Sequence, residues 1–264
     1  MGPAPGARLG GKTKLAAEQK SIDALGQFKL HPVLGTLGEQ LHVSQSVLFM
    51  LLSAVLILLF LYVGMRPRAI VPGRLQSAAE FAYEFIYNMA SDQIGPQGRR
   101  FFPFVFTLFS FILVGNYIGL FPGAFTYTSH IAVTAALAIM VFVLAVIVSL
   151  TSQGLKFFTH FMPEGAPIAL APLLVPIEIL TFLSRPVSLS IRLFANMVAG
   201  HVMFDMFAAF TIMLGGLHLI GPVLGVAPLI VNMALMALEL LVGALQAYVF
   251  AILTCIYLRE AVAH

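Results

Sequence analysis

The chain has 264 residues, of which 60% are hydrophobic and only 9% are charged. Soluble domains carry about 25% charged residues, so this composition excludes a soluble globular domain and, with its long apolar blocks, predicts an all-α integral membrane protein. The net charge is +3, the positive residues are not pooled into one nucleic-acid-binding patch, and there is one cysteine, Cys255. One cysteine makes no intrachain disulfide and no thiolate metal cluster, and we expect neither a nucleic-acid partner nor a cofactor.

The N-terminal region differs in composition from the rest of the chain. Residues 1–43 read as a glycine-rich, basic tail that leads to a short amphipathic segment, and residues 44–264 read as the membrane domain. The tail lacks the apolar core of a secretory signal. It contains one arginine and no serine before Ser21, unlike a typical mitochondrial transit peptide.

Three apolar spans precede residue 152. Residues 45–64 carry no charge and are long enough to cross about 30 Å of hydrocarbon as a helix. Residues 75–89 instead place apolar side chains on one helical stripe, opposite Glu80, Glu84 and Asn88, which predicts an amphipathic helix at the membrane surface. The second and third spans cover about 101–121 and 129–151, with a short connection between them.

The last part of the chain contains two apolar segments that exceed one perpendicular crossing. They cover residues 166–214, with four internal prolines, and 222–258. A helix of 40 residues is about 60 Å long, twice the hydrocarbon thickness, so these segments must tilt, kink or lie partly flat. We predict a long, strongly tilted helical hairpin over 166–258, giving about five membrane helices and one interfacial helix.

Loop charges predict the orientation. Region 65–100 contains five arginines and should face the cytoplasm or its equivalent, whereas loops 121–130 and 215–222 contain no Lys or Arg. The C-terminus is then cytoplasmic. The N-terminus lies outside, in conflict with the five basic residues of the tail.

The first segment of the hairpin places a permanent cation in an apolar run. Ser188, Arg192 and Asn196 follow at intervals of four and share one helical stripe, while His201 falls on the opposite side. Glu178 lies on about the same face as Arg192 if the helix continues through Pro186. Ionisable groups inside a membrane are costly and indicate function, although Arg185, beside the proline, also reads as an interface residue.

The second segment carries one polar line. Asn232, Glu239 and Gln246 repeat every seven residues and so return to nearly the same face, as in a hydrophilic seam against a partner helix. Asn232 and Gln246, like Asn116 in the second span, also fit the alternative of interhelical hydrogen bonding alone.

Two stretches, "RPVSLSIRLFANMVAGH" and "LQAYVFAILTCIYL", resemble the signature stretches of subunit a of the F-type ATP synthase. The resemblance is strong over roughly 100–260. It implies that Arg192 is the essential stator arginine facing the rotor ring. "GNYIGLFP" resembles the segment near the outer access channel, although some bacterial members have an acid in place of Gly119. With the polar line, the expected proton path comprises Glu178, Asn196, His201, Glu239, Gln246, Asn116 and Asn232.

One departure from many bacterial members is informative. They have Glu at the position of His201 and His at the position of Glu239, whereas this chain resembles mitochondrial and related bacterial members. An exchanged proton-relay pair keeps its chemistry if the two side chains are neighbours, so we expect contact between His201 and Glu239 across the hairpin.

The resemblance implies a proton-translocating stator with two half-channels and no catalytic site of its own. Its expected partners are the rotor c-ring, peripheral-stalk proteins of the subunit b type, the catalytic head and the lipid bilayer. The expected location is the bacterial inner membrane, with the mitochondrial inner membrane as the alternative. A secondary proton-coupled transporter is the alternative function, although the two halves show no internal symmetry.

Overall fold

The computed structural model describes residues 45–66, 73–121, 126–154, 171–216 and 221–262, and all structural statements here concern these residues. They form six α-helices and one 3-10 turn: α3 (Gln45–Met65), α4 (Arg74–Ile94), α5 (Gly98–Gly119), η2 (Tyr127–Ser129), α6 (Ile131–Gln153), α7 (Ala171–Gly215) and α8 (Gly221–Val262). The predicted tail and amphipathic segment over 1–43 lie outside the described residues.

Five of the described helices are long and apolar enough to cross a membrane, namely α3, α5, α6 and the two long helices α7 and α8. This confirms the predicted all-α membrane fold. α8 extends to Val262, beyond the expected end at 258, and its last turn carries Glu260, which forms an ion pair with Arg185 of α7. The ion pair of Glu260 with Arg185 stabilises this last turn, which accounts for the continuation of α8 beyond its apolar residues.

Helix α4 is the amphipathic helix that the sequence predicts, but its buried face is rotated. Of the expected stripe, Ala79, Ile86 and Met89 are buried, whereas Leu75 and Phe85 are exposed. The helix packs against α3, α5 and α8 rather than against one flat surface, so the buried side chains follow those three contacts.

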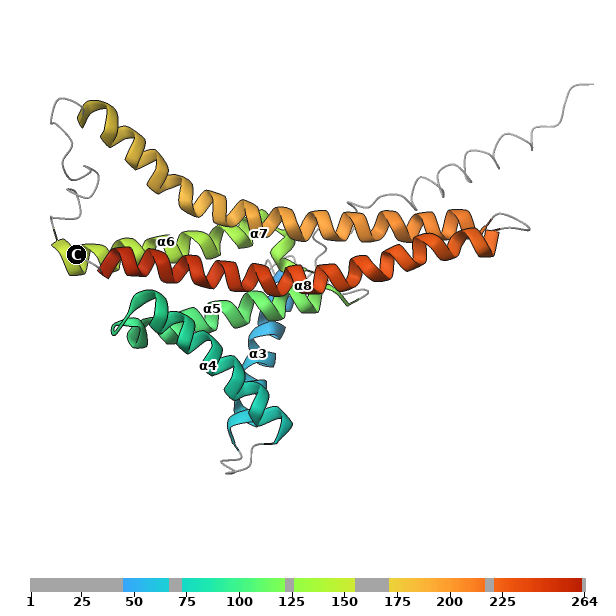
Figure 1. Cartoon of the computed structure of the whole chain (residues 1–264), viewed down its shortest axis with the longest axis horizontal. Coiled ribbons are helices and arrows are strands. Elements are labelled where there is room, and N and C mark those ends of the chain that lie inside the picture. Colours follow the sequence, from blue (N-terminus) through green and yellow to red (C-terminus); the bar gives the residue numbers. More distant parts are fainter. Residues whose placement is uncertain (1–44, 67–72, 122–125, 155–170, 217–220, 263–264) are drawn as a thin grey trace, which may run out of the picture.

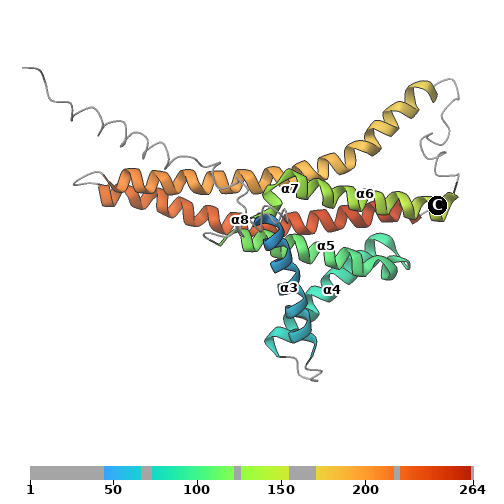
Figure 2. The same cartoon turned by 180° about the vertical axis from the view of Figure 1, so that it is seen from behind.

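The two long helices form an antiparallel hairpin, and α5 and α6 lie alongside it (Figure 1). Pro176 and Pro186 lie inside α7 and Pro228 lies inside α8 without ending either helix. The first part of α7 leans away from α8, as both views show (Figure 2). A proline removes one helical hydrogen bond and bends the helix, so the two prolines in this part of α7 account for the bend.

The core lies where α4, α5, α6, α7 and α8 meet. Its largest fully buried apolar side chains include Ile86, Val105, Ile112, Leu193 and Phe250. Much of α3 and the far part of the hairpin instead present large apolar side chains outward. Such a surface fits lipid or another membrane subunit, since neither environment penalises exposed hydrocarbon.

Candidate functional site

The hairpin brings together a histidine and a carboxyl group. His201 of α7 and Glu239 of α8 have side chains only 14% and 8% exposed, and His201 Nε2 lies 3.9 Å from Glu239 Oε1. This confirms the predicted contact across the hairpin. The carboxyl group reaches α7 because residue 200 is glycine: a Cβ there would lie 2.5 Å from Glu239 Oε1.

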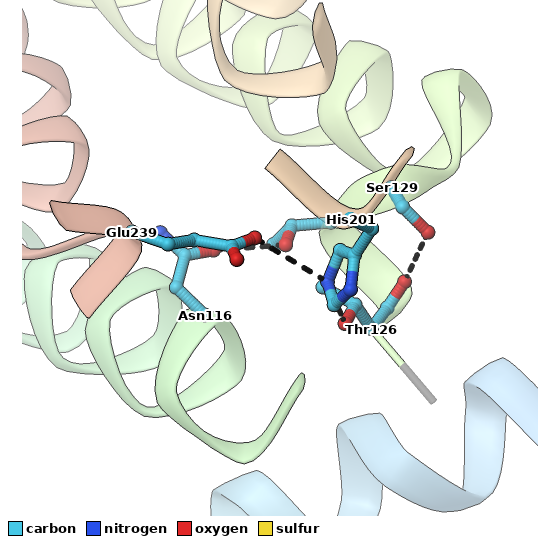
Figure 3. Close-up of polar contacts among 6 residues, drawn as sticks. Asn116, Thr126, Ser129, His201 and Glu239 are labelled. Carbon is cyan, nitrogen blue, oxygen red and sulfur yellow. Dashed lines mark hydrogen bonds and ion pairs between the residues drawn. The ribbon is translucent and has the colours of Figure 1, made fainter. Parts of the chain in front are cut away.

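The histidine ring lies between this carboxyl group and a loop hydroxyl (Figure 3). Thr126, just before η2, places Oγ1 2.8 Å from His201 Nε2. By contrast, 3.9 Å is too long for a direct hydrogen bond between His201 and Glu239. Glu239 Oε1 is buried and has no hydrogen-bond partner among the described residues, so it remains available to a proton donor.

Asn116 links α5 to α8 and to the loop. Its Nδ2 donates to the Gly243 carbonyl at 3.0 Å, and its Oδ1 accepts from Thr128 Oγ1 at 2.8 Å. The contact needs a small residue on α8, because a Cβ at Gly243 would lie 3.3 Å from the Asn116 Cβ. Asn116 is therefore an interhelical hydrogen-bonding residue, and its place in a proton path stays a prediction.

The predicted polar line on α8 faces the interior of the protein. Asn232, Glu239 and Gln246 are all buried, whereas their neighbours Met233 and Leu240 are exposed. Asn232 Oδ1 has no hydrogen-bond partner among the described residues. Seven residues of helix separate each member from the next by roughly 10 Å, so these groups are spread along α8 rather than gathered at one point.

Arg192 lies on a different face of α7 from this site. Arg192 and Ser188 are exposed, and Asn196 and Glu178 are partly buried. The side of the helix that carries Leu193 is buried against the rest of the protein. The structure therefore brings His201 and Glu239 together and separates Arg192 from them by helical face, as the sequence predicts.

Arg185 is an interface residue, one of the two alternatives that the sequence leaves open. It forms an ion pair with Glu260. Its guanidinium also lies over two rings, 5.8 Å from the centroid of Phe182 and 5.5 Å from that of Tyr257. These contacts tie α7, one residue before Pro186, to the end of α8.

The loop hydroxyls are not among the residues that the sequence pattern predicts to be functional. Between α5 and α6 the pattern predicts only a short connection, yet Thr126, Tyr127, Thr128 and Ser129 are all buried. Tyr127 donates its hydroxyl to the Phe111 carbonyl at 2.7 Å, and burial raises the pKa of Tyr127 well above its ordinary value. The available signal is the run of four hydroxyl residues, "TYTS", between two apolar spans.

The described residues contain no group of three or more His, Cys, Asp or Glu side chains placed to hold a metal ion. The contacts of His201, Glu239, Thr126 and Asn116 show a site built from hydrogen-bonding and proton-exchanging groups. The Thr126 hydroxyl and the Glu239 carboxyl group both face the same ring nitrogen, His201 Nε2, which donates or accepts a proton according to the state of the ring.

Comparison with known proteins gives consistent matches. The family model described as ATP synthase A chain matches residues 47–259. ATP synthase subunit a of Gluconacetobacter diazotrophicus is 76% identical over 248 residues, covering 94% of this chain and 100% of the relative. The proteins of the same name from Gluconobacter oxydans and Rhodospirillum rubrum are 67% and 47% identical, covering 94% and 89% of this chain and 100% and 96% of the relatives.

Proposed function

The chain belongs to the ATP synthase A chain family, and on that premise we propose that it is the proton-conducting stator subunit of an F-type ATP synthase. The observation that carries the proposal is the exposure of Arg192 on α7, on a different face from His201 and Glu239. An arginine in a membrane helix needs a partner that compensates for its charge. A neighbouring subunit that carries carboxyl groups supplies such a partner.

The rotor ring brings one carboxyl group per subunit past Arg192. A bare carboxylate is costly in lipid, so each group crosses the lipid zone in its protonated form. A nearby arginine typically lowers the pKa of an acid by about 1–3 units, so each carboxyl group releases its proton beside Arg192. The fixed positive charge also keeps protons from passing directly between the two half-channels.

The outer half-channel passes the site formed by His201 and Glu239. A histidine suits proton transfer because its unperturbed pKa is near 6.5. Moving one charge through 100 mV releases about 2.3 kcal/mol, and rotation delivers this energy to the catalytic head. The remaining members of the proposed proton path are Glu178, Asn196, Gln246, Asn116 and Asn232.

The proposed partners are the c-ring, peripheral-stalk proteins of the subunit b type and the catalytic head. We place the chain in a bacterial plasma membrane, with the N-terminus outside and the C-terminus in the cytoplasm. The arginines at 66, 74, 99 and 100 then lie on the inner side, and the loop with η2 lies on the outer side.

The test replaces Arg192 with alanine in the complete complex. Arg192→Ala should abolish proton-driven ATP synthesis in membrane vesicles while the complex still assembles with its ring. Ser188→Ala, one helical turn earlier and also exposed, is the matched control and should keep synthesis within about twofold. Normal ATP synthesis by the Arg192→Ala complex would defeat the assignment.

A second test addresses the pair in the outer half-channel. Because His201 and Glu239 are neighbours, the double exchange His201→Glu with Glu239→His should conduct more protons than either single replacement. Passive proton flow through the membrane sector measures this directly. Equal loss in the exchange and in the single variants would show that the two groups do not act as a pair.

A further inference from the structure

Three consecutive loop residues each place a hydroxyl against a different part of the helical framework. Thr126 Oγ1 lies 2.8 Å from His201 Nε2 of α7. Tyr127 donates to the Phe111 carbonyl of α5, and Thr128 donates to Asn116, which in turn binds α8. The segment of residues 126–128 before α6 is thus docked on the helices. Its first residue contacts the His201 ring of α7, and the next two contact α5.

The Thr126 side chain is buried and packs closely against Gly119. Thr126 is 4% exposed, and a Cβ at Gly119 would lie 1.9 Å from Thr126 Oγ1 and 2.7 Å from its Cβ. Any side chain at position 119 would therefore displace the threonine. The backbone is held as well, because the Thr126 carbonyl accepts from the Ser129 hydroxyl and from the Ser129 amide.

We propose that Thr126 is a positioning residue for proton transfer, which holds His201 through Nε2 in the orientation that faces Glu239. The inference rests on the proposed function, since it assigns a role within the outer half-channel. Thr126 acts through His201 and is not itself ionised or protonated during the transfer.

The chemistry of the hydroxyl suits this role in both states of the ring. When Nε2 carries a proton, Nε2 donates and Thr126 Oγ1 accepts; when Nε2 is bare, the hydroxyl rotates and donates. The ring is therefore held before and after each transfer; during a transfer the Nε2 proton leaves the hydrogen bond to Thr126 and moves toward Glu239. A valine has nearly the same shape but offers neither interaction, so it would leave the buried ring nitrogen without this partner.

The decisive comparison uses two substitutions in the intact complex. Thr126→Val should lower passive proton conduction about tenfold, and Thr126→Ser, which keeps the hydroxyl, should stay within about threefold of the original. Assembly with the ring is measured alongside. Thr107→Val is the matched control, because the Thr107 hydroxyl is exposed and bonds only within its own helix, to the Pro103 carbonyl; it should conduct normally.

A double variant separates positioning from general damage. If Thr126 acts through His201, adding Thr126→Val to His201→Ala should cause no further loss of conduction. If Thr126→Val does not assemble, Gly119→Ala provides the test, since it displaces the hydroxyl without removing it and should also lower conduction.

The results distinguish this inference from the proposed function. Full conduction in Thr126→Val, equal loss in Thr126→Ser, or normal conduction in Gly119→Ala would overturn the role of Thr126 and leave the stator assignment intact. The stator assignment fails separately, if Arg192→Ala still drives ATP synthesis.

Discussion

Gly200 sets how closely the carboxyl group of Glu239 approaches α7. A Cβ at this position would lie 2.5 Å from Oε1, 2.8 Å from Cδ and 3.2 Å from Cγ of Glu239, whereas ordinary contact begins at about 3.4 Å. In a Gly200→Ala variant the carboxyl group must therefore withdraw by about 0.9 Å, from 2.5 Å to 3.4 Å.

The substitution should impair transport more than stability. Alanine favours the helix by about 1 kcal/mol over glycine, while overpacking costs about 1–3 kcal/mol, so the net change in stability lies between about 0 and 2 kcal/mol. A misplacement of about 1 Å in a reacting group can cost up to about 100-fold in rate. Because the glutamate side chain is flexible and can partly compensate, we expect about a tenfold loss of proton conduction, equivalent to about 1.4 kcal/mol.

The assay is passive proton flow through the reconstituted membrane sector, normalised to the amount of assembled complex. Gly215→Ala is the matched control, since it adds the same methyl group at the end of the same helix, where nothing lies within 4 Å. Wild-type conduction in Gly200→Ala would refute the claim that the approach of Glu239 to α7 limits transfer. Equal losses in both variants would refute it as well.

Three further predictions concern stability. Arg185→Glu and Glu260→Arg should each lower the thermal stability of the complex by about 1 kcal/mol, and the double exchange should restore most of it; additive losses would contradict a direct ion pair. Tyr127→Phe, which removes the hydrogen bond to Phe111, should cost about 0.5–1.5 kcal/mol in the same measurement, and an unchanged melting temperature would contradict this. Burial lowers the pKa of His130, so stability should fall as the pH drops below about 6.5, and His130→Asn should reduce that dependence; an identical pH profile would argue against it.

Periodicity and charge predict the helices of this protein well. Apolar blocks of sufficient length identify the membrane helices, and the spacing of Arg192 and His201 on α7, with the seven-residue repeat that contains Glu239 on α8, identifies the helical face that each of the three occupies. Two of the three then prove to be neighbours across the hairpin, as the exchange of residue types between family members implies.

The hydroxyl network is harder to predict, because it depends on tertiary contacts between segments far apart in the sequence. Thr126 and His201 are 75 positions apart, and Asn116 and Gly243 are 127 apart. Threonine is a common residue in short connections, so its contact with a helix distant in sequence is evident only from the three-dimensional structure. The close approaches at Gly119 and Gly200 are equally invisible to periodicity, since glycine adds nothing to an apolar stripe.

The docked loop also constrains how the protein is made. During synthesis α5 and the loop precede α7 and α8. The hydrogen bond between Thr128 and Asn116 can therefore form first. The partners of the Thr126 hydroxyl and of the Asn116 amide, on α7 and α8, are synthesised later. Unsatisfied polar groups are expensive in hydrocarbon. The Thr126 hydroxyl and the Asn116 amide therefore gain these partners only when the hairpin of α7 and α8 packs against α5 and the loop.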